Sequence, residues 1–142
     1  MADASLDKRR LVGKLAYLLR HAARERGLAM DAGGWVSVAD VVALLNDEPS
    51  GWLDGDVLSV ERITGFIHGH AANRFELEGG RVRARYGHSI PGLAVARSET
   101  PPEVLFHGTR YSLVERLREV GLQPMGRSHV HLSSDFTYAK RV

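Results

Sequence analysis

The chain has 142 residues, 44% of them hydrophobic and 25% charged, a composition that is typical of a folded globular protein and excludes a disordered one. It has no cysteine, which excludes disulfides and thiolate metal sites and fits a reducing compartment, so the cytoplasm is the default expectation. The net charge is only +2, yet residues 31–61 hold seven acids and no Lys or Arg, whereas residues 1–30 and 62–97 carry +4 each.

The first predicted element is a helix. Apolar residues recur at helical spacing from Leu11 to Ala22, and Gly27 is placed to end the helix. Residues 28–30 form a short extended candidate, and the glycine-rich segment 31–34 predicts a turn.

Two further helices and a hairpin follow. Ser37 and Ser59 each precede an apolar periodic segment and are predicted helix N-caps. Residues 75–78 and 81–86 alternate apolar with charged side chains around Gly79-Gly80, which predicts a β-hairpin. Three helices followed by a basic two-stranded ribbon are the order of a winged-helix domain, a fold used on nucleic acids and also in protein contacts.

The pattern changes near residue 90. Residues 91–103 contain three prolines and lack periodicity, as a linker would. Beyond it we predict a strand at 104–106, a helix at 111–120 ended by glycine, a strand at 130–132, and a final helix capped by Ser134. Two strands and about one and a half helices are too few to bury a core, so this lobe is expected to be incomplete at its C-terminus.

Several basic side chains could contact phosphate. Arg20-His21 could bind a phosphate dianion and donate a proton, or could be a surface pair favoured by the dipole of the helix C-terminus. Arg74 begins the hairpin, and alternation places Arg81, Arg83 and Arg85 on one face, where they could follow a nucleic-acid backbone or simply be solvated. His88-Ser89 could donate to phosphate oxygens or form a plain turn.

Two motifs in the second lobe could bind other ligands. His107-Gly108-Thr109 follows a predicted strand, and a glycine that admits close backbone approach beside a hydroxyl suits a nucleotide ribose or amide. His129 and His131 share one face of a predicted strand, but Asp135 is the only nearby third ligand. We therefore expect no metal site.

Six short motifs, taken in order, resemble the RNA 2′-phosphotransferase family of the bacterial KptA type. They are Leu19-Arg20-His21, Gly27-Leu28 with Asp31 to Val36, Arg74-Phe75-Glu76, Gly87-His88-Ser89, Leu105 to Thr109, and Gly121 to Ser133.

The resemblance implies an α+β protein in which a winged-helix RNA-binding lobe (1–90) is followed by a linker (91–103) and the N-terminal part of an ADP-ribosyltransferase-type, NAD-binding lobe (104–142). It implies catalytic roles for Arg20, His21, Arg74 and Arg127, and NAD binding by His107, Gly108, Thr109, His131 and Ser133. Arg81, Arg83, Arg85, His88 and Ser89 are expected to bind RNA.

The implied reaction uses NAD as a co-substrate and has two steps. The RNA 2′-phosphate displaces nicotinamide, and the ribose 2″-hydroxyl then attacks the resulting phosphodiester to release ADP-ribose 1″,2″-cyclic phosphate. The expected partners are NAD and a tRNA-like RNA that carries a 2′-phosphate, with no membrane and no stable protein partner. Two alternatives remain open: an ADP-ribosyltransferase acting on terminal nucleic-acid phosphates or on protein, and a non-catalytic winged-helix module.

Overall fold

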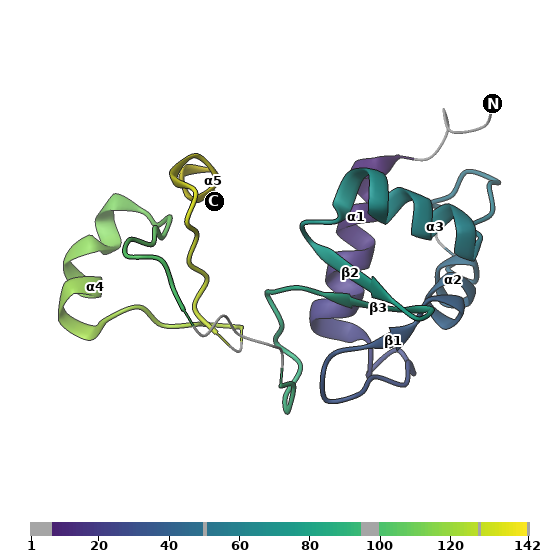
Figure 1. The fold of residues 1–142 in the computed structure, drawn as a ribbon, viewed down its shortest axis with the longest axis horizontal. Helices are drawn as coiled ribbons and strands as arrows, with labels where there is room; N and C mark the ends of the chain where they lie inside the picture. Colours follow the sequence, from purple (N-terminus) through teal and green to yellow (C-terminus); the bar gives the residue numbers. More distant parts are fainter. Residues whose placement is uncertain (1–6, 50, 95–99, 128, 142) are drawn as a thin grey trace. The chain divides into compact units, whose positions relative to one another are not determined.

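The computed structural model describes residues 7–49, 51–94, 100–127 and 129–141. Helices and a small antiparallel sheet give the α+β class that the sequence predicts. The chain divides into two compact units, Met1–Val95 and Ala96–Val142 (Figure 1). Within the described part, no helix is both long and apolar enough to cross a membrane.

Side-chain caps begin the three α-helices of the first unit, which are α1 (Lys8–Tyr17), α2 (Val38–Asn46) and α3 (Val60–Phe66). The hydroxyls of Ser37 and Ser59 accept the backbone N–H groups of Asp40 and Arg62, so both predicted caps are confirmed. Asp7 caps α1 in the same way and was not foreseen.

Two of these helices continue as single π-helical segments, η1 (Leu18–Ala22) after α1 and η2 (Ile67–Ala71) after α3. The chain then turns at Gly27, which adopts φ +84°, and the N–H of Leu28 bonds to the carbonyl of Ala23 at 2.9 Å. Gly27 therefore ends the helical region as predicted. The extended candidate at 28–30 is not a strand, and the Leu28 N–H is already used in this terminating turn.

The sheet of the first unit has the order β1-β3-β2, with β1 at Val36–Ser37, β2 at Phe75–Glu78 and β3 at Arg81–Ala84. All pairs are antiparallel. Gly79 and Gly80 both have positive φ, 54° and 74°, as a two-residue hairpin turn requires. The predicted hairpin is confirmed, and it lies in front of α1 in Figure 1.

A single apolar core joins the helices to one face of this sheet. Its fully buried members come from α1, η1, β1, α2, α3, η2, β2 and β3; the largest are Phe75, Leu11, Leu15, Leu19, Ile63, Ile67, Val36, Val38, Val41 and Val82. Phe75, Val82 and Ala84 alternate with charged residues along the hairpin, so the opposite face is left to arginines and glutamates.

The first part of the predicted linker belongs to the first unit. Ile90, directly before the predicted linker, is a buried member of the core, and Leu93 packs against the same core. The N–H of Ala94 bonds to the carbonyl of Ala32, and Arg24 donates to the carbonyl of Pro91. Residues 95–99 of the predicted linker lie outside the described residues.

The second unit is built from a 3₁₀ turn, η3 (Tyr111–Leu113), and two helices, α4 (Val114–Val120) and α5 (Phe136–Lys140). Gly121 ends α4 with φ +78°, as predicted. The predicted N-cap of the last helix, Ser134, was wrong. Asp135 accepts the N–H groups of Thr137 and Tyr138 instead. Asp and Ser are about equally favoured as N-caps, so residue type alone does not decide between these two neighbouring positions.

The two strands predicted at 104–106 and 130–132 do not form. They are replaced by one antiparallel bridge, in which Phe106 and Ser133 exchange both backbone hydrogen bonds. To extend this pair into a ladder, the carbonyls of His131 and Asp135 would have to accept backbone N–H groups. Side chains bond to these two carbonyls here, His107 to the carbonyl of His131 and the Ser133 hydroxyl to the carbonyl of Asp135.

Candidate active site

Arg20 and His21 lie on the π-helical segment η1, where single π turns are often functional. Leu18, Leu19 and Ala22 of the same segment are buried and fix it in the core, while Arg20 and His21 are half-buried. The wide turn thus presents two consecutive polar side chains from a rigid base.

The segment Tyr86–Ser89 packs against this pair. The Arg20 guanidinium lies 4.8 Å from the centre of the Tyr86 ring, a cation–π arrangement. Gly87 has φ +88°, and a Cβ there would come within 3.0 Å of Arg20 Cδ. Only glycine suits both the backbone conformation and the close approach of the arginine.

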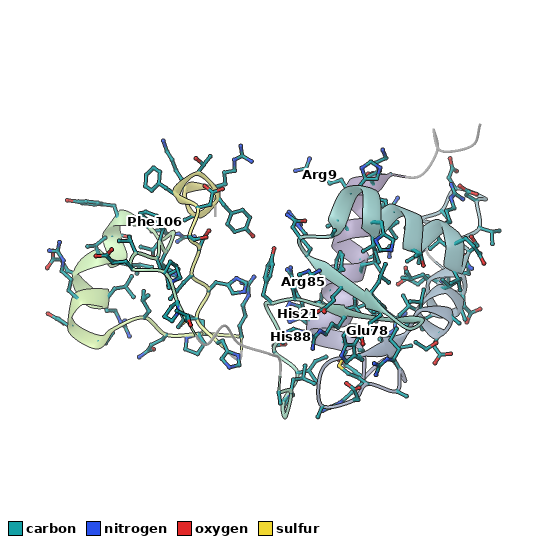
Figure 2. All side chains as sticks on the ribbon, in the orientation of Figure 1. Arg9, His21, Glu78, Arg85, His88 and Phe106 are labelled. Atoms are coloured by element: carbon teal, nitrogen blue, oxygen red, sulfur yellow. The ribbon has the colours of Figure 1, made fainter. Side chains whose placement is uncertain are left out.

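Ser89 makes two contacts with the same pair. Its backbone N–H donates to the carbonyl of Arg20 at 2.9 Å, and its hydroxyl lies 2.7 Å from Nδ1 of His21. Figure 2 labels His21 and the neighbouring His88. The structure thus places Ser89 against His21, and its expected binding to RNA stays a prediction.

His88 is the one buried polar residue of the described chain, with 6% of its surface exposed. Burial, followed by electrostatic repulsion from Arg20, Arg83 and His21, lowers the pKa of its imidazole to about 4, although a hydrogen bond to the backbone of Ala84 acts in the opposite sense. Its Nε2 has no hydrogen-bond partner in the described part of the structure. The predicted role of His88 as an RNA donor is untested, but the ring is neutral and enclosed.

The backbone of Arg74 lies close to the Tyr86–Ser89 segment. Its carbonyl accepts the N–H of Arg85, the residue before Tyr86, at 2.9 Å. The side chain is half-buried and has no carboxylate partner among the described residues. Its charge is therefore available for a ligand.

The three hairpin arginines share the outer face of the sheet, as the alternation predicts, but they differ in their contacts. Arg83 pairs with Glu76 at 2.8 Å, donates to the carbonyl of Gly33, and is only 15% exposed in its side chain. Arg81 is 47% exposed and lies 3.5 Å from Asp31. Arg85 donates to the carbonyl of Ala72 and lies 3.7 Å from Glu76.

Trp35 is a participant that sequence reasoning missed. The guanidinium carbons of Arg81 and Arg83 lie 5.0 and 4.5 Å from the centre of its ring. Tyr86 was missed as well. Tyr86 directly follows the alternating arginines, which was an available signal because guanidinium groups stack on aromatic faces. Trp35 is far from them in the sequence and had no such signal.

In the second unit, the Phe106–Ser133 bridge gathers the residues predicted to bind NAD. Nδ1 of His107 donates to the carbonyl of His131 at 2.8 Å, and Nη1 of Arg127 donates to Nδ1 of His131 at 2.5 Å. Gly108 and Thr109 follow His107 directly. Four predicted residues, His107, Arg127, His131 and Ser133, are thus joined within this unit. The convergence of Arg127 with Arg20, His21 and Arg74 on one phosphate stays a prediction.

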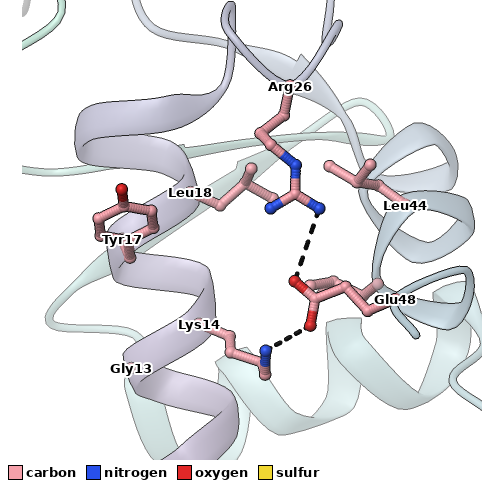
Figure 3. A pocket seen from close by; sticks show the side chains of 8 residues that line it. Gly13, Lys14, Tyr17, Leu18, Arg26, Leu44 and Glu48 are labelled. Carbon is pink, nitrogen blue, oxygen red and sulfur yellow. Dashed lines mark hydrogen bonds and ion pairs between the residues drawn. The ribbon is translucent and has the colours of Figure 1, made fainter. Parts of the chain in front are cut away.

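A separate pocket of about 280 Å³ lies between α1 and α2. Glu48 in this pocket is paired with Lys14 and, at 3.6 Å, with Arg26 (Figure 3). Tyr17 also lines it, and its ring centre is 5.8 Å from that of His21. None of the predicted site residues lines this pocket. No group of three or more possible metal ligands occurs among the described residues.

Comparison with known proteins agrees with the motifs. The sequence profile of "RNA 2′-phosphotransferase, Tpt1 / KptA family" matches residues 7–142. A protein of Acetivibrio thermocellus named "Probable RNA 2′-phosphotransferase" is 40% identical over 137 residues, which cover 96% of this chain and 73% of that protein. A protein of the same name from Rhizobium rhizogenes is 39% identical over 100% of this chain and 72% of its own length. Another from Pyrococcus furiosus is 35% identical over 92% of this chain and 68% of its own length. The chain belongs to the RNA 2′-phosphotransferase family.

Proposed function

We propose that this protein removes an internal 2′-phosphate from RNA in an NAD-dependent reaction that passes through ADP-ribosylated RNA. The observation that carries the proposal is the family match over residues 7–142, within which Arg20 and His21 are held by the Tyr86–Ser89 segment. The products would be 2′-hydroxyl RNA, nicotinamide and ADP-ribose 1″,2″-cyclic phosphate.

The first unit would be the RNA-binding lobe. Its element order, α1-β1-α2-α3-β2-β3 with β1 beside β3, supports a winged-helix domain. The half-buried Arg74 and the exposed Arg81 and Arg85 supply positive charge for phosphates. The acids of residues 31–61 disfavour RNA binding at the α2–α3 side, so the hairpin and η1 are the better candidates for the RNA surface.

The second unit would belong to the ADP-ribosyltransferase-type lobe and bind NAD. Because Nδ1 of His107 donates to a carbonyl, its proton is at Nδ1 and Nε2 carries a lone pair that can accept a ribose hydroxyl. The hydroxyls of Thr109 and Ser133 and the backbone at Gly108 add short polar groups suited to an amide or a ribose. These residues fit a nucleotide.

In the first step, an oxygen of the RNA 2′-phosphate bonds to the anomeric carbon as the glycosidic bond to nicotinamide breaks, and nicotinamide leaves as a neutral molecule. This step needs positioning more than acid–base help. In the second, the ribose 2″-hydroxyl would attack phosphorus and pass its proton to His21, and His21 would return this proton to the RNA 2′-oxygen as the bond from that oxygen to phosphorus breaks. The guanidiniums of Arg20, Arg74 and Arg127 would stabilise the charge that builds on the phosphate.

The test is an RNA oligonucleotide with one internal 2′-phosphate, incubated with and without NAD. We expect the 2′-hydroxyl product only with NAD, and we expect His21→Ala to accumulate the ADP-ribosylated RNA because the second step loses its proton acceptor. An oligonucleotide with a terminal phosphate is the matched comparison. Equal dephosphorylation without NAD would refute the proposal, and preferential modification of the terminal phosphate would favour an ADP-ribosyltransferase instead.

A further inference from the structure

The proposed reaction requires His21 to present one particular ring nitrogen in one protonation state. We propose that Ser89 is a positioning residue that fixes this state: its hydroxyl accepts the proton of His21 Nδ1, so that Nε2 is the nitrogen with the lone pair that meets the substrate. The inference rests on the proposed function for its consequence and on the 2.7 Å contact between Ser89 and His21 for its geometry.

Ser89 is itself held rigidly, which a positioning residue must be. Its backbone N–H is bonded to the carbonyl of Arg20, the residue before the one its side chain contacts. Buried neighbours flank it, His88 on one side and Ile90 on the other. The backbone of Ser89 therefore bonds to Arg20 and its side chain contacts His21, and these two contacts with consecutive residues of η1 restrict the position of the hydroxyl.

The 2.7 Å contact allows either direction of the hydrogen bond, and the proposed function selects one of them. If the hydroxyl donated to Nδ1, the ring proton would lie on Nε2, and a neutral ring could not accept a proton at the substrate side. If Nδ1 donates to the hydroxyl, Nε2 keeps its lone pair. A partner that holds an imidazole in the reactive tautomer is a recurrent requirement in catalysis by histidine.

The surroundings suit a neutral partner. Arg20 precedes His21 in η1, the ring centre of Tyr17 lies 5.8 Å from that of His21, and the buried His88 is near enough for His21 to lower its pKa. A neutral hydroxyl orients the ring without adding a negative charge beside the arginines that would bind phosphate. His88 fits the same pattern, because its buried neutral ring adds no third positive charge to this cluster.

The first measurement is ¹⁵N NMR of the His21 ring at neutral pH in the full chain, with the signals assigned by their loss in His21→Gln. We expect Nδ1 to carry the proton in the wild type. In Ser89→Ala the hydroxyl is lost but the backbone bond to Arg20 remains, and we expect the proton to shift to Nε2. Ser89→Thr, which keeps a hydroxyl, should restore the wild-type pattern.

The second measurement is turnover of 2′-phosphorylated RNA. Ser89→Ala should slow release of the cyclic phosphate by on the order of tenfold or more while nicotinamide release changes less, and Ser89→Thr should recover. Ser59→Ala is the matched control, since it removes an N-cap of α3 and lowers stability but does not contact His21.

The two measurements separate this inference from the proposed function. A wild-type ring protonated at Nε2, or an unchanged ring pattern in Ser89→Ala, overturns the inference whatever the activity. A serine-dependent ring pattern in a protein that leaves 2′-phosphorylated RNA untouched supports the positioning by Ser89 and refutes the proposed function.

Discussion

Acid should destabilise the first unit through His88. The folded protein holds this imidazole neutral down to a pH of about 4, because it is buried and faces Arg20, Arg83 and His21. In the unfolded chain the ring takes up a proton near its ordinary pKa of 6.5. The unfolded state therefore binds more protons between these two values, and the free energy of unfolding falls as the pH falls through this window.

The size of the effect follows from the two pKa values. A full shift of this kind is worth about 3 kcal/mol, and about 2 kcal/mol of it is lost between pH 7 and pH 5. Above pH 7 the contribution is nearly constant, and about one pH unit below the folded pKa it no longer changes, because both states are then protonated. This loss is a large part of the stability of a small domain, which is typically about 5–15 kcal/mol.

Urea unfolding at pH 7, 6 and 5 measures this loss. Both tryptophans, Trp35 and Trp52, lie in the first unit, so their fluorescence follows the unit that contains His88. The comparison variant is His88→Asn, whose amide can donate to the Ala84 backbone but does not titrate. We compare the change in unfolding free energy with pH, so that a constant loss of stability in the variant cancels. Equal pH dependence in the two proteins would refute the reasoning.

The remaining predictions concern the arginines. Arg81→Gln should reduce the magnitude of the slope of log affinity for RNA against log salt concentration by up to about one, whereas Arg83→Gln should mainly lower the melting temperature, because Arg83 is already bonded to Glu76 and Gly33. The opposite pattern would show that Arg83 is the phosphate contact. Arg127→Lys should lower turnover at least about tenfold, because lysine keeps the charge and loses the planar fork. Arg118→Lys, in an exposed pair with Glu115, is its control, and normal turnover in Arg127→Lys would contradict the assignment.

Local signals in the sequence were sufficient for much of the first unit. Ser37 and Ser59 act within three residues of their own positions, and Gly79-Gly80 requires a turn that few other residues allow. The alternation of apolar and charged residues along the hairpin indicated which face of the sheet is buried. These features depend on near neighbours, so a single sequence contains them.

Features that depend on distant contacts could not be predicted. The sheet register places a glutamate opposite each of two arginines, Glu78 opposite Arg81 and Glu76 opposite Arg83. Arg83 pairs with its glutamate, whereas Arg81 lies near Asp31, which is 50 residues away in the sequence. Nothing adjacent to His88 indicates that it is buried, because its surroundings come from η1, from β3 and from the turn at Gly34. In the second unit the two predicted strands are reduced to the Phe106–Ser133 bridge, and the His107 and Ser133 side chains that bond beside it are likewise contacts that strand periodicity does not report.

The π-helical segment makes both the site and the core depend on the length of this helix. A π turn holds one residue more than an α turn. In η1 this wide turn presents Arg20 and His21 to the Tyr86–Ser89 segment, while Leu18, Leu19 and Ala22 are buried. Deleting one residue within Leu18–Ala22 would rotate the residues that follow the deletion. Arg20 and His21 could then no longer both meet that segment, and buried side chains would be displaced as well, so chemistry and packing together constrain the length of this helix.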